Sequence, residues 1–516
     1  MRSAQDSTLD GANLRPVMRR LWPLPVIMLL SLGWALACFN ALQVGQAVDD
    51  ASYVTLARSL ASGQGYRMVC YAGAPPEVKY PPLLPLLIVP CLALAHGALW
   101  ATRLPALLCM LGAIPVLWAL LRRLVGGPAL WLLVALMAVH PLLAAFTAAP
   151  MTETASLLLS WAVLLLLLQG EERGDGRRFL AAGVLLGLAL LLRTDSVALL
   201  AAALLWLALG RRWRPLAQVA APALLLFAPW VAYAWGVGHV DPTQQSYLHE
   251  VATGWWDPSP WPLRLWHGLS QYLFAYIPEQ TTLVFGDIVQ GAAAARGLGP
   301  VVIAAEVVVG LVVILGLVRS WRRLPLLIGL FVVVRLAMLT AFAPVSRYLL
   351  PILPFLVICL AVGLEGLLSR GWRKEPQGAA PAPRRVLLVL CALLLLPALA
   401  RDGLLLVRPP RNDYPDPVAG GQLIAAHTPP GAVVLSNWSS KSFALYGEGR
   451  LVVEPRRGTE AGGPDELLAA AGPATHLLLV GPPFQAVAVH AYEQSPRLKL
   501  VAEQARQGLW LFALRR

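Results

Sequence analysis

Residues 102–123 read TRLPALLCMLGAIPVLWALLRR, a long apolar run with an arginine pair directly behind it. A helix needs about 20 apolar residues to cross a bilayer, and arginines gather on the cytoplasmic side of such helices. The same pattern recurs along the 516 residues, of which 58% are hydrophobic and only 13% are charged. An ordinary soluble chain is about 25% charged. The composition therefore excludes a soluble protein and predicts an integral membrane protein.

About eleven segments are apolar enough to cross a membrane, which predicts an all-α, multi-pass membrane domain. They are residues 21–42, 102–121, 128–145, 152–169, 178–193, 196–210, 215–236, 299–318, 324–342, 348–368 and 386–407. Basic clusters fall at every second connection, and one of them, with Arg15, Arg19 and Arg20, precedes the first segment. The N-terminus is then cytoplasmic, and an odd number of crossings puts the C-terminus outside. The net charge of +13 thus reports topology, and nucleic acid is not an expected partner.

We expect three parts in a chain of the cytoplasmic (inner) membrane. They are a cytoplasmic N-terminus (1–20), a transmembrane domain (21–407) with outer loops at 43–101 and 237–298, and an extracytoplasmic domain (408–516). The last part carries the runs AVVLSN, RLVVEP, THLLLVG, LKLVAE and LWLFAL, bounded by glycine and proline, with a helical stretch near 464–471. Short apolar runs between such residues are typical of strands. We therefore predict a small α/β domain outside the membrane.

Two helices of the first outer loop are expected to lie at the membrane interface without crossing it. Residues 82–97 are apolar but short and contain Pro85 and Pro90, and a crossing there would put the next basic clusters outside. Residues 51–61 place their apolar side chains on one face, which predicts an amphipathic helix on the membrane surface.

Acidic side chains mark the outer ends of two segments. Asp49 and Asp50 stand where the first segment leaves the membrane, and Glu153 opens the fourth. Either aspartate could simply cap the helix that follows, and Glu153 could simply favour the helix dipole. A carboxylate at this boundary could instead act as a general base for a substrate at the membrane surface.

Basic and aromatic residues lie on the same outer side. Lys79 and Tyr80 precede two prolines, and Arg347 and Tyr348 open the tenth segment. An outward lysine or arginine either anchors the chain at the interface or binds an anionic head group. Arg193 either pairs with Asp195 or binds such a head group. We expect these basic residues to bind phosphate.

In their order along the chain, these features resemble GT-C class glycosyltransferases. The resemblance rests on Asp49-Asp50 with Tyr53 after it, the Lys-Tyr-Pro-Pro-Leu turn at 79–83, the acid opening the fourth segment, and Arg-Tyr-Leu-Leu-Pro-x-Leu-Pro at 347–354. The chain is similar to the lipid A aminoarabinose transferases and the protein O-mannosyltransferases, and the resemblance covers nearly the whole chain. Glu153 departs from the pattern, because close relatives often carry aspartate there.

The resemblance implies an enzyme that takes a sugar from a polyprenyl phosphate at the outer face and gives it, with inversion, to a hydroxyl of a lipid, glycan or protein. The general base would be Asp49, with Asp50 as the alternative. Lys79 and Arg347 would stabilise the leaving phosphate, and Tyr53, Tyr80, Arg193 and Tyr348 would help to bind substrate. Glu153 would position the acceptor or share a divalent cation with Asp49, and the sequence leaves that cofactor open. Asp49, Lys79, Glu153 and Arg347 should then surround one cavity.

Two other kinds of function compete with this one. A transporter or flippase of lipid-linked sugars should carry ionisable residues near the middle of its spans, where this chain has only Glu306 and Arg335. A non-catalytic assembly protein of the cell envelope would give no reason for acids and bases to gather at several outer edges. The sequence therefore favours the glycosyltransferase.

Overall fold

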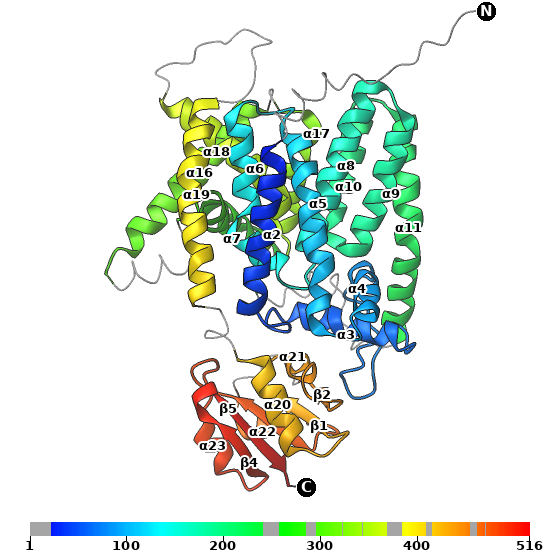
Figure 1. Cartoon of the computed structure of the whole chain (residues 1–516), viewed down its shortest axis with the longest axis vertical. Helices are drawn as coiled ribbons and strands as arrows, with labels where there is room; N and C mark the ends of the chain where they lie inside the picture. The colour runs from blue at the N-terminus through cyan, green and yellow to red at the C-terminus, as the bar shows by residue number, and fades with distance from the viewer. Residues whose placement is uncertain are drawn as a thin grey trace, which may run out of the picture.

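The computed structural model describes residues 22–240, 257, 259–284, 296–321, 324–342, 344–368, 384–408, 415–454, 462–469 and 471–515. The arginines of the N-terminal cluster and residues 241–256, 258 and 285–295 of the 237–298 loop lie outside these residues. A helical bundle and a smaller domain with a β-sheet make up the described chain (Figure 1).

The bundle is built almost entirely of helices. Its longer helices are α2 (Pro23–Ala41), α3 (Asp49–Ala61), α4 (Leu83–Leu94), α5 (Leu104–Leu121), α6 (Pro128–Ala138), α7 (Pro141–Thr147), α8 (Glu153–Arg173), α9 (Gly176–Leu192), α10 (Val197–Leu209), α11 (Trp213–Val240), α13 (Trp261–Gln271), α14 (Ile277–Thr282), α16 (Gly299–Ser320), α17 (Leu326–Leu339), α18 (Leu353–Leu368) and α19 (Arg384–Val407). The short turns η1 (Leu99–Arg103), η2 (Thr194–Ser196), η3 (Tyr272–Tyr276) and η4 (Ser346–Ile352) join or extend them.

Each of the eleven predicted segments contains a helix, which confirms a multi-pass membrane domain. Among the described residues, six helices are long and apolar enough to cross a membrane, and the bent pair α6 and α7, which meet at 51°, would make a seventh. Helices α2, α9, α10 and α17 run beside them (Figure 1) but are shorter. Eleven crossings and the orientation of the bundle stay predictions.

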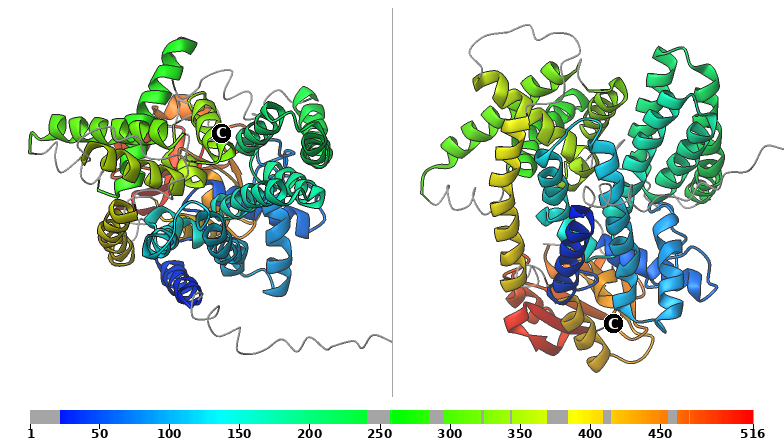
Figure 2. Two further views of the ribbon diagram at one scale, coloured as in Figure 1. Left: turned by 90° about the horizontal axis from the view of Figure 1, so that it is seen from above. Right: turned by 45° about the horizontal axis from the view of Figure 1, so that its top comes forward.

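Close packing in the bundle depends on small residues. Helix α9 lies against α11, and a Cβ atom at Gly183 would come within 2.5 Å of the Val219 carbonyl oxygen and of the Pro222 ring. Glycine therefore lets the two backbones approach, as is usual between membrane helices. Helix α2 lies at the edge of the bundle when it is seen from above (Figure 2), and its outward Leu29 and Leu30 are exposed.

The two expected interfacial helices turn out differently. Helix α4 occupies the predicted place and is too short to cross a bilayer. The prediction of an amphipathic surface helix at α3 was wrong, because most of α3 is buried, including the polar Ser52, Thr55 and Ser59. One face packs against α4, and Ala51 and Val54 on another face pack against Leu445 of the C-terminal domain.

The C-terminal domain contains all five predicted strands and the predicted helix. Its strands are β1 (Val433–Ser436), β2 (Leu451–Val453), β3 (His476–Val480), β4 (Leu498–Gln504) and β5 (Leu509–Leu514), and its helices are α20 (Pro417–His427), α21 (Ser440–Ala444), α22 (Pro464–Ala469) and α23 (Val489–Glu493), with the turn η6 (Ala505–Gln507). The sheet order is β2-β1-β3-β5-β4, in which β1 is parallel to both neighbours and β5 antiparallel to both of its own. Leu477 and Leu479 face one core and Leu478 and Val480 the other, so both faces of the sheet are buried.

The first outer loop joins the sheet of the C-terminal domain. The Val452 N–H in edge strand β2 donates to the Cys70 carbonyl (2.8 Å), and the Ala72 N–H donates back to the Val452 carbonyl (3.1 Å). The Tyr446 hydroxyl donates to the Val44 carbonyl (2.9 Å) at the start of the same loop. Helix α3 is thus held between bundle and domain, as Figure 1 shows.

Candidate active site

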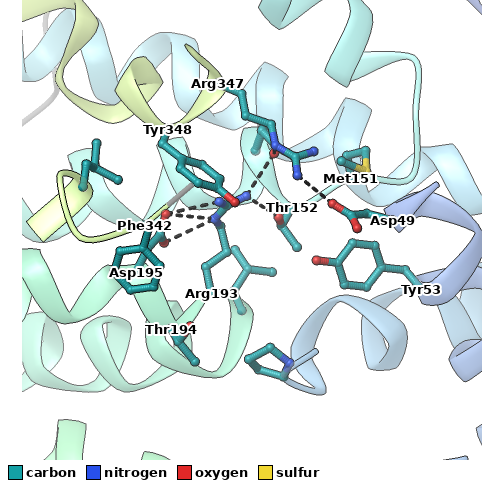
Figure 3. Close-up of a pocket in the computed structure, with 14 residues that line it drawn as sticks. Asp49, Tyr53, Met151, Thr152, Arg193, Thr194, Asp195, Phe342, Arg347 and Tyr348 are labelled. Carbon is teal, nitrogen blue, oxygen red and sulfur yellow. Dashed lines mark hydrogen bonds and ion pairs between the residues drawn. The ribbon is translucent and has the colours of Figure 1, made fainter. Parts of the chain in front are cut away.

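A cavity opens among helix ends of the bundle and is lined in part by Asp49 and Tyr53 of α3, the helix that also packs against the C-terminal domain. Its wall comes from six places in the sequence: the start of α3, the residues just before α4, the start of α8, the turn between α9 and α10, the end of α17, and η4. Each place is the end of a helix, so polar side chains can reach the cavity without entering the apolar core. Figure 3 shows Asp49, Arg193 and Arg347 among the side chains directed toward it.

Asp49 is the most accessible acid of the site, with a quarter of its side chain exposed. One carboxylate oxygen accepts from the Arg347 guanidinium (2.6 Å) and the other from the Tyr80 hydroxyl (2.8 Å). Burial alone would raise the pKa of Asp49, but the charge of Arg347 and the two hydrogen bonds hold that pKa below its usual value. Asp49 is therefore an anion that a substrate can reach.

Asp50 serves the backbone and does not line the cavity. Its side chain is fully buried, and its two oxygens accept from the Gly45 N–H (2.6 Å) and the Ala51 N–H (2.8 Å). Burial raises the pKa of Asp50 to about 6. Asp50 thus fixes the turn before α3, where Val48 adopts a left-handed φ of 66°, and this turn aims Asp49 at the cavity.

Glu153 lies between two arginines at the base of the cavity. Its side chain is only 2% exposed, and one oxygen is 2.9 Å from Arg193 Nη1 and 3.5 Å from Arg347 Nε. The other oxygen has no hydrogen-bond partner among the described residues. Arg347 therefore bridges Glu153 to Asp49.

Arg193 and Asp195 form an ion pair, which was one of the two predicted alternatives. This pair lies within the same site. Asp195 also accepts from Arg335 of α17 (2.9 Å), which is nearly fully buried. The Arg335 Nε donates to the Tyr348 carbonyl (2.9 Å), so it ties η4 to this cluster. Arg335 was not among the predicted site residues, although a charge inside an apolar span is in itself a sign of function.

Aromatic rings complete the wall. The Tyr348 ring lies under the guanidinium groups of Arg193 (5.1 Å to the ring centre) and Arg347 (5.6 Å). Tyr53 lines the cavity and packs edge-on against Tyr80, which lies behind it. Such contacts restrict the arginines to positions from which they can face a ligand.

Lys79, like Asp50 and Tyr80, is a predicted site residue that does not line the cavity. Its ammonium lies 5.7 Å from the centre of the Tyr80 ring. The expectation that four residues surround one cavity is therefore met by Asp49, Glu153 and Arg347 but not by Lys79.

The residues proposed for a metal do not fit one well. The described residues hold no group of three or more acidic, histidine or cysteine side chains that could bind an ion. Asp49 and Glu153 are separated by the Arg347 guanidinium, which contacts both. A cation shared between them would meet that positive charge, and we assign no step to a metal.

Residues 79–233 match the family described as dolichyl-phosphate-mannose-protein mannosyltransferase. This part of the chain is thus similar to a family of glycosyltransferases. The matched stretch holds Lys79, Tyr80, Glu153, Arg193 and Asp195, and thus part of the cavity wall. The resemblance seen in the sequence and the prediction of a glycosyltransferase are confirmed. No curated protein sequence matches the chain significantly.

Solved structures share the fold. ArnT from Cupriavidus metallidurans bound to undecaprenyl phosphate is 14% identical, with a TM-score of 0.59 over 96% of this chain and 98% of that one. Its apo form is 15% identical, with a TM-score of 0.56 over 94% and 97%. The apo oligosaccharyltransferase of Archaeoglobus fulgidus is 10% identical, with a TM-score of 0.53 over 89% of this chain and 70% of that one. The combination of helical bundle and C-terminal domain is therefore a fold seen in membrane glycosyltransferases.

Proposed function

We propose that the chain transfers a sugar from a polyprenyl phosphate to an acceptor hydroxyl at the outer face of the cytoplasmic membrane. The observation that carries this proposal is an ionised, reachable Asp49 with two arginines behind it in a cavity among helix ends of the bundle. The donor class is supported by the family that matches residues 79–233 and by the undecaprenyl phosphate bound to a protein of the same fold.

In this reaction the acceptor oxygen attacks the anomeric carbon while the bond to the phosphate oxygen breaks. Asp49 takes the proton of the acceptor hydroxyl, whose acidity rises as the new bond forms. The lowered pKa of Asp49 makes it a weak base that is ionised at neutral pH, which suits a transition state with strong positive charge on the sugar. A single displacement inverts the anomeric centre.

The basic residues would stabilise the leaving phosphate. Arg347 lies beside Asp49, and Lys79 lies on the approach, over Tyr80. Fixed positive groups placed where charge develops lower the barrier, because they need no reorganisation during the step. Glu153 keeps Arg193 and Arg347 in place.

The test uses membranes that contain the full chain and a series of synthetic polyprenyl-phosphate sugars. Release of polyprenyl phosphate that depends on the chain and on an added acceptor would support the proposal. The absence of turnover with every monophosphate donor, together with turnover of polyprenyl-diphosphate sugars, would contradict it.

A further inference from the structure

Lys441 brings a positive charge from the C-terminal domain to the edge of this site. It lies on α21, and its ammonium is 5.7 Å from the centre of the Tyr80 ring, the same distance as that of Lys79. The hydroxyl of the same ring donates to Asp49. One tyrosine therefore contacts the acid of the cavity and two lysines from different domains.

The position of Lys441 is fixed by contacts on both sides of it. Helix α21 packs on α3, and the Leu445 carbonyl just after α21 accepts from Arg58 Nη1 (3.4 Å). Edge strand β2 pairs with Cys70 and Ala72 of the loop that leads to Tyr80. The interface thus fixes the backbone of α21, from which the Lys441 side chain reaches the Tyr80 ring.

Positive and negative charges inside the cavity cancel. Three carboxylates face three guanidinium groups there: Asp49, Glu153 and Asp195 against Arg193, Arg335 and Arg347. A phosphate diester has one negative charge before transfer, and the monoester that leaves can carry two. The cavity alone offers no net charge to balance it.

Lys441 can supply the missing charge. No ion pair joins it to a carboxylate of the described residues. The nearby Glu77 accepts the N–H groups of Lys79 (2.5 Å) and Tyr80 (3.2 Å) at its Oε1, and Glu454 at the end of β2 accepts from the Tyr71 hydroxyl. One oxygen of each carboxylate is thus engaged by a neighbour other than Lys441. The ammonium group of Lys441 remains able to contact an anion that enters past Tyr80.

We propose that Lys441 binds the phosphate of the polyprenyl phosphate and stabilises it as it leaves, so that the C-terminal domain supplies part of the active site. This inference rests on the proposed function. When the bond between the anomeric carbon and the phosphate oxygen breaks, its electron pair stays on that oxygen. The second negative charge then forms close to Lys441 and Lys79, while the proton of the acceptor goes to Asp49.

The test measures binding of polyprenyl phosphate, polyprenol and inorganic phosphate to the purified full chain in detergent. Lys441→Gln should weaken binding of polyprenyl phosphate about tenfold, as expected for the loss of one charged hydrogen bond, and should leave polyprenol binding unchanged. Lys441→Arg should bind nearly as well as the native chain. Lys499→Gln, at an exposed lysine of β4, is the matched control and should change nothing.

Each outcome has a distinct meaning. Equal affinity of the native chain and Lys441→Gln for polyprenyl phosphate would overturn the inference, and so would an equal loss of polyprenol binding, which would indicate a packing role. If Lys441→Gln weakened binding of inorganic phosphate and left binding of polyprenyl phosphate unchanged, Lys441 would serve a free phosphate, which would also overturn the inference. A native chain that binds no polyprenyl phosphate at all would instead refute the proposed function.

Discussion

Replacing Glu153 by glutamine tests whether the cavity depends on its balanced charges. Glu153 is 2% exposed and contacts Arg193 and Arg347, which are themselves only 14% and 20% exposed. Glutamine has nearly the same shape but no charge. Two buried guanidinium groups would then lose one of their carboxylates, and Arg347 would be held by Asp49 alone at this site.

The expected cost follows from the distances. With an effective dielectric constant of about 20, the 2.9 Å and 3.5 Å contacts correspond to about 6 and 5 kcal/mol of attraction before desolvation. Desolvation of Glu153 offsets much of this, and removing one partner of a buried pair typically costs 3–5 kcal/mol. Glutamine keeps an acceptor oxygen, so we expect Glu153→Gln to lower the free energy of unfolding by about 3 kcal/mol.

The assay compares denaturant unfolding of the full chain in detergent for two variants of one helix. Glu172, at the other end of α8, pairs with Arg123 at 2.7 Å, but 55% of its side chain is exposed. Glu172→Gln should therefore cost less than about 1 kcal/mol. Equal effects of Glu153→Gln and Glu172→Gln would refute the view that Glu153 is held in a buried charge network.

Three further results are expected. Burial raises the pKa of Asp50 to about 6, so the folded chain binds more protons than the unfolded chain between about pH 4 and 6. Its free energy of unfolding should therefore fall by about 3 kcal/mol as the pH rises through that window. In Asp50→Asn, pH-dependent unfolding should show no such fall. Tyr80→Phe removes a hydrogen bond that lowers the pKa of Asp49, so the acidic limb of the kcat/KM profile should move to higher pH, and an unmoved limb would exclude Asp49 as the titrating group. Val452→Pro removes the N–H that donates to Cys70, so limited proteolysis should cut residues 62–76 faster than in the native chain, and an unchanged rate would show that β2 does not hold this loop.

The elements of the fold could be predicted because each of them has a local signature. Apolar runs of about 20 residues produced the helices of the bundle, and short runs between glycine and proline produced the five strands. Helix α3 could not be predicted correctly from its own residues. Its apolar side chains on one face predicted a helix on the membrane surface, but its polar Ser52, Thr55 and Ser59 are buried. The helix packs against a domain almost 400 residues further on. Nothing local encodes that contact.

The candidate site was predictable where residues lie at helix ends on the same side. Asp49, Glu153, Arg193 and Arg347 were expected on the outer side and meet in one cavity. The choice between Asp49 and Asp50 could not be made from the sequence, because it depends on the turn at Val48 that sends one side chain inward and the other to the backbone. Arg335 and Lys441 were missed because they come from a span and a domain whose contacts with the site are long-range.

The central claim is that Asp49 is the base of a sugar transfer from polyprenyl phosphate. Its most direct test compares transfer rates of the purified native chain, Asp49→Asn and Asp49→Glu, with binding of polyprenyl phosphate as the control for an intact site. We expect Asp49→Asn to lower the transfer rate at least about a hundredfold while it still binds polyprenyl phosphate. Asp49→Glu should retain part of the rate. Transfer by Asp49→Asn at the native rate would contradict the central claim.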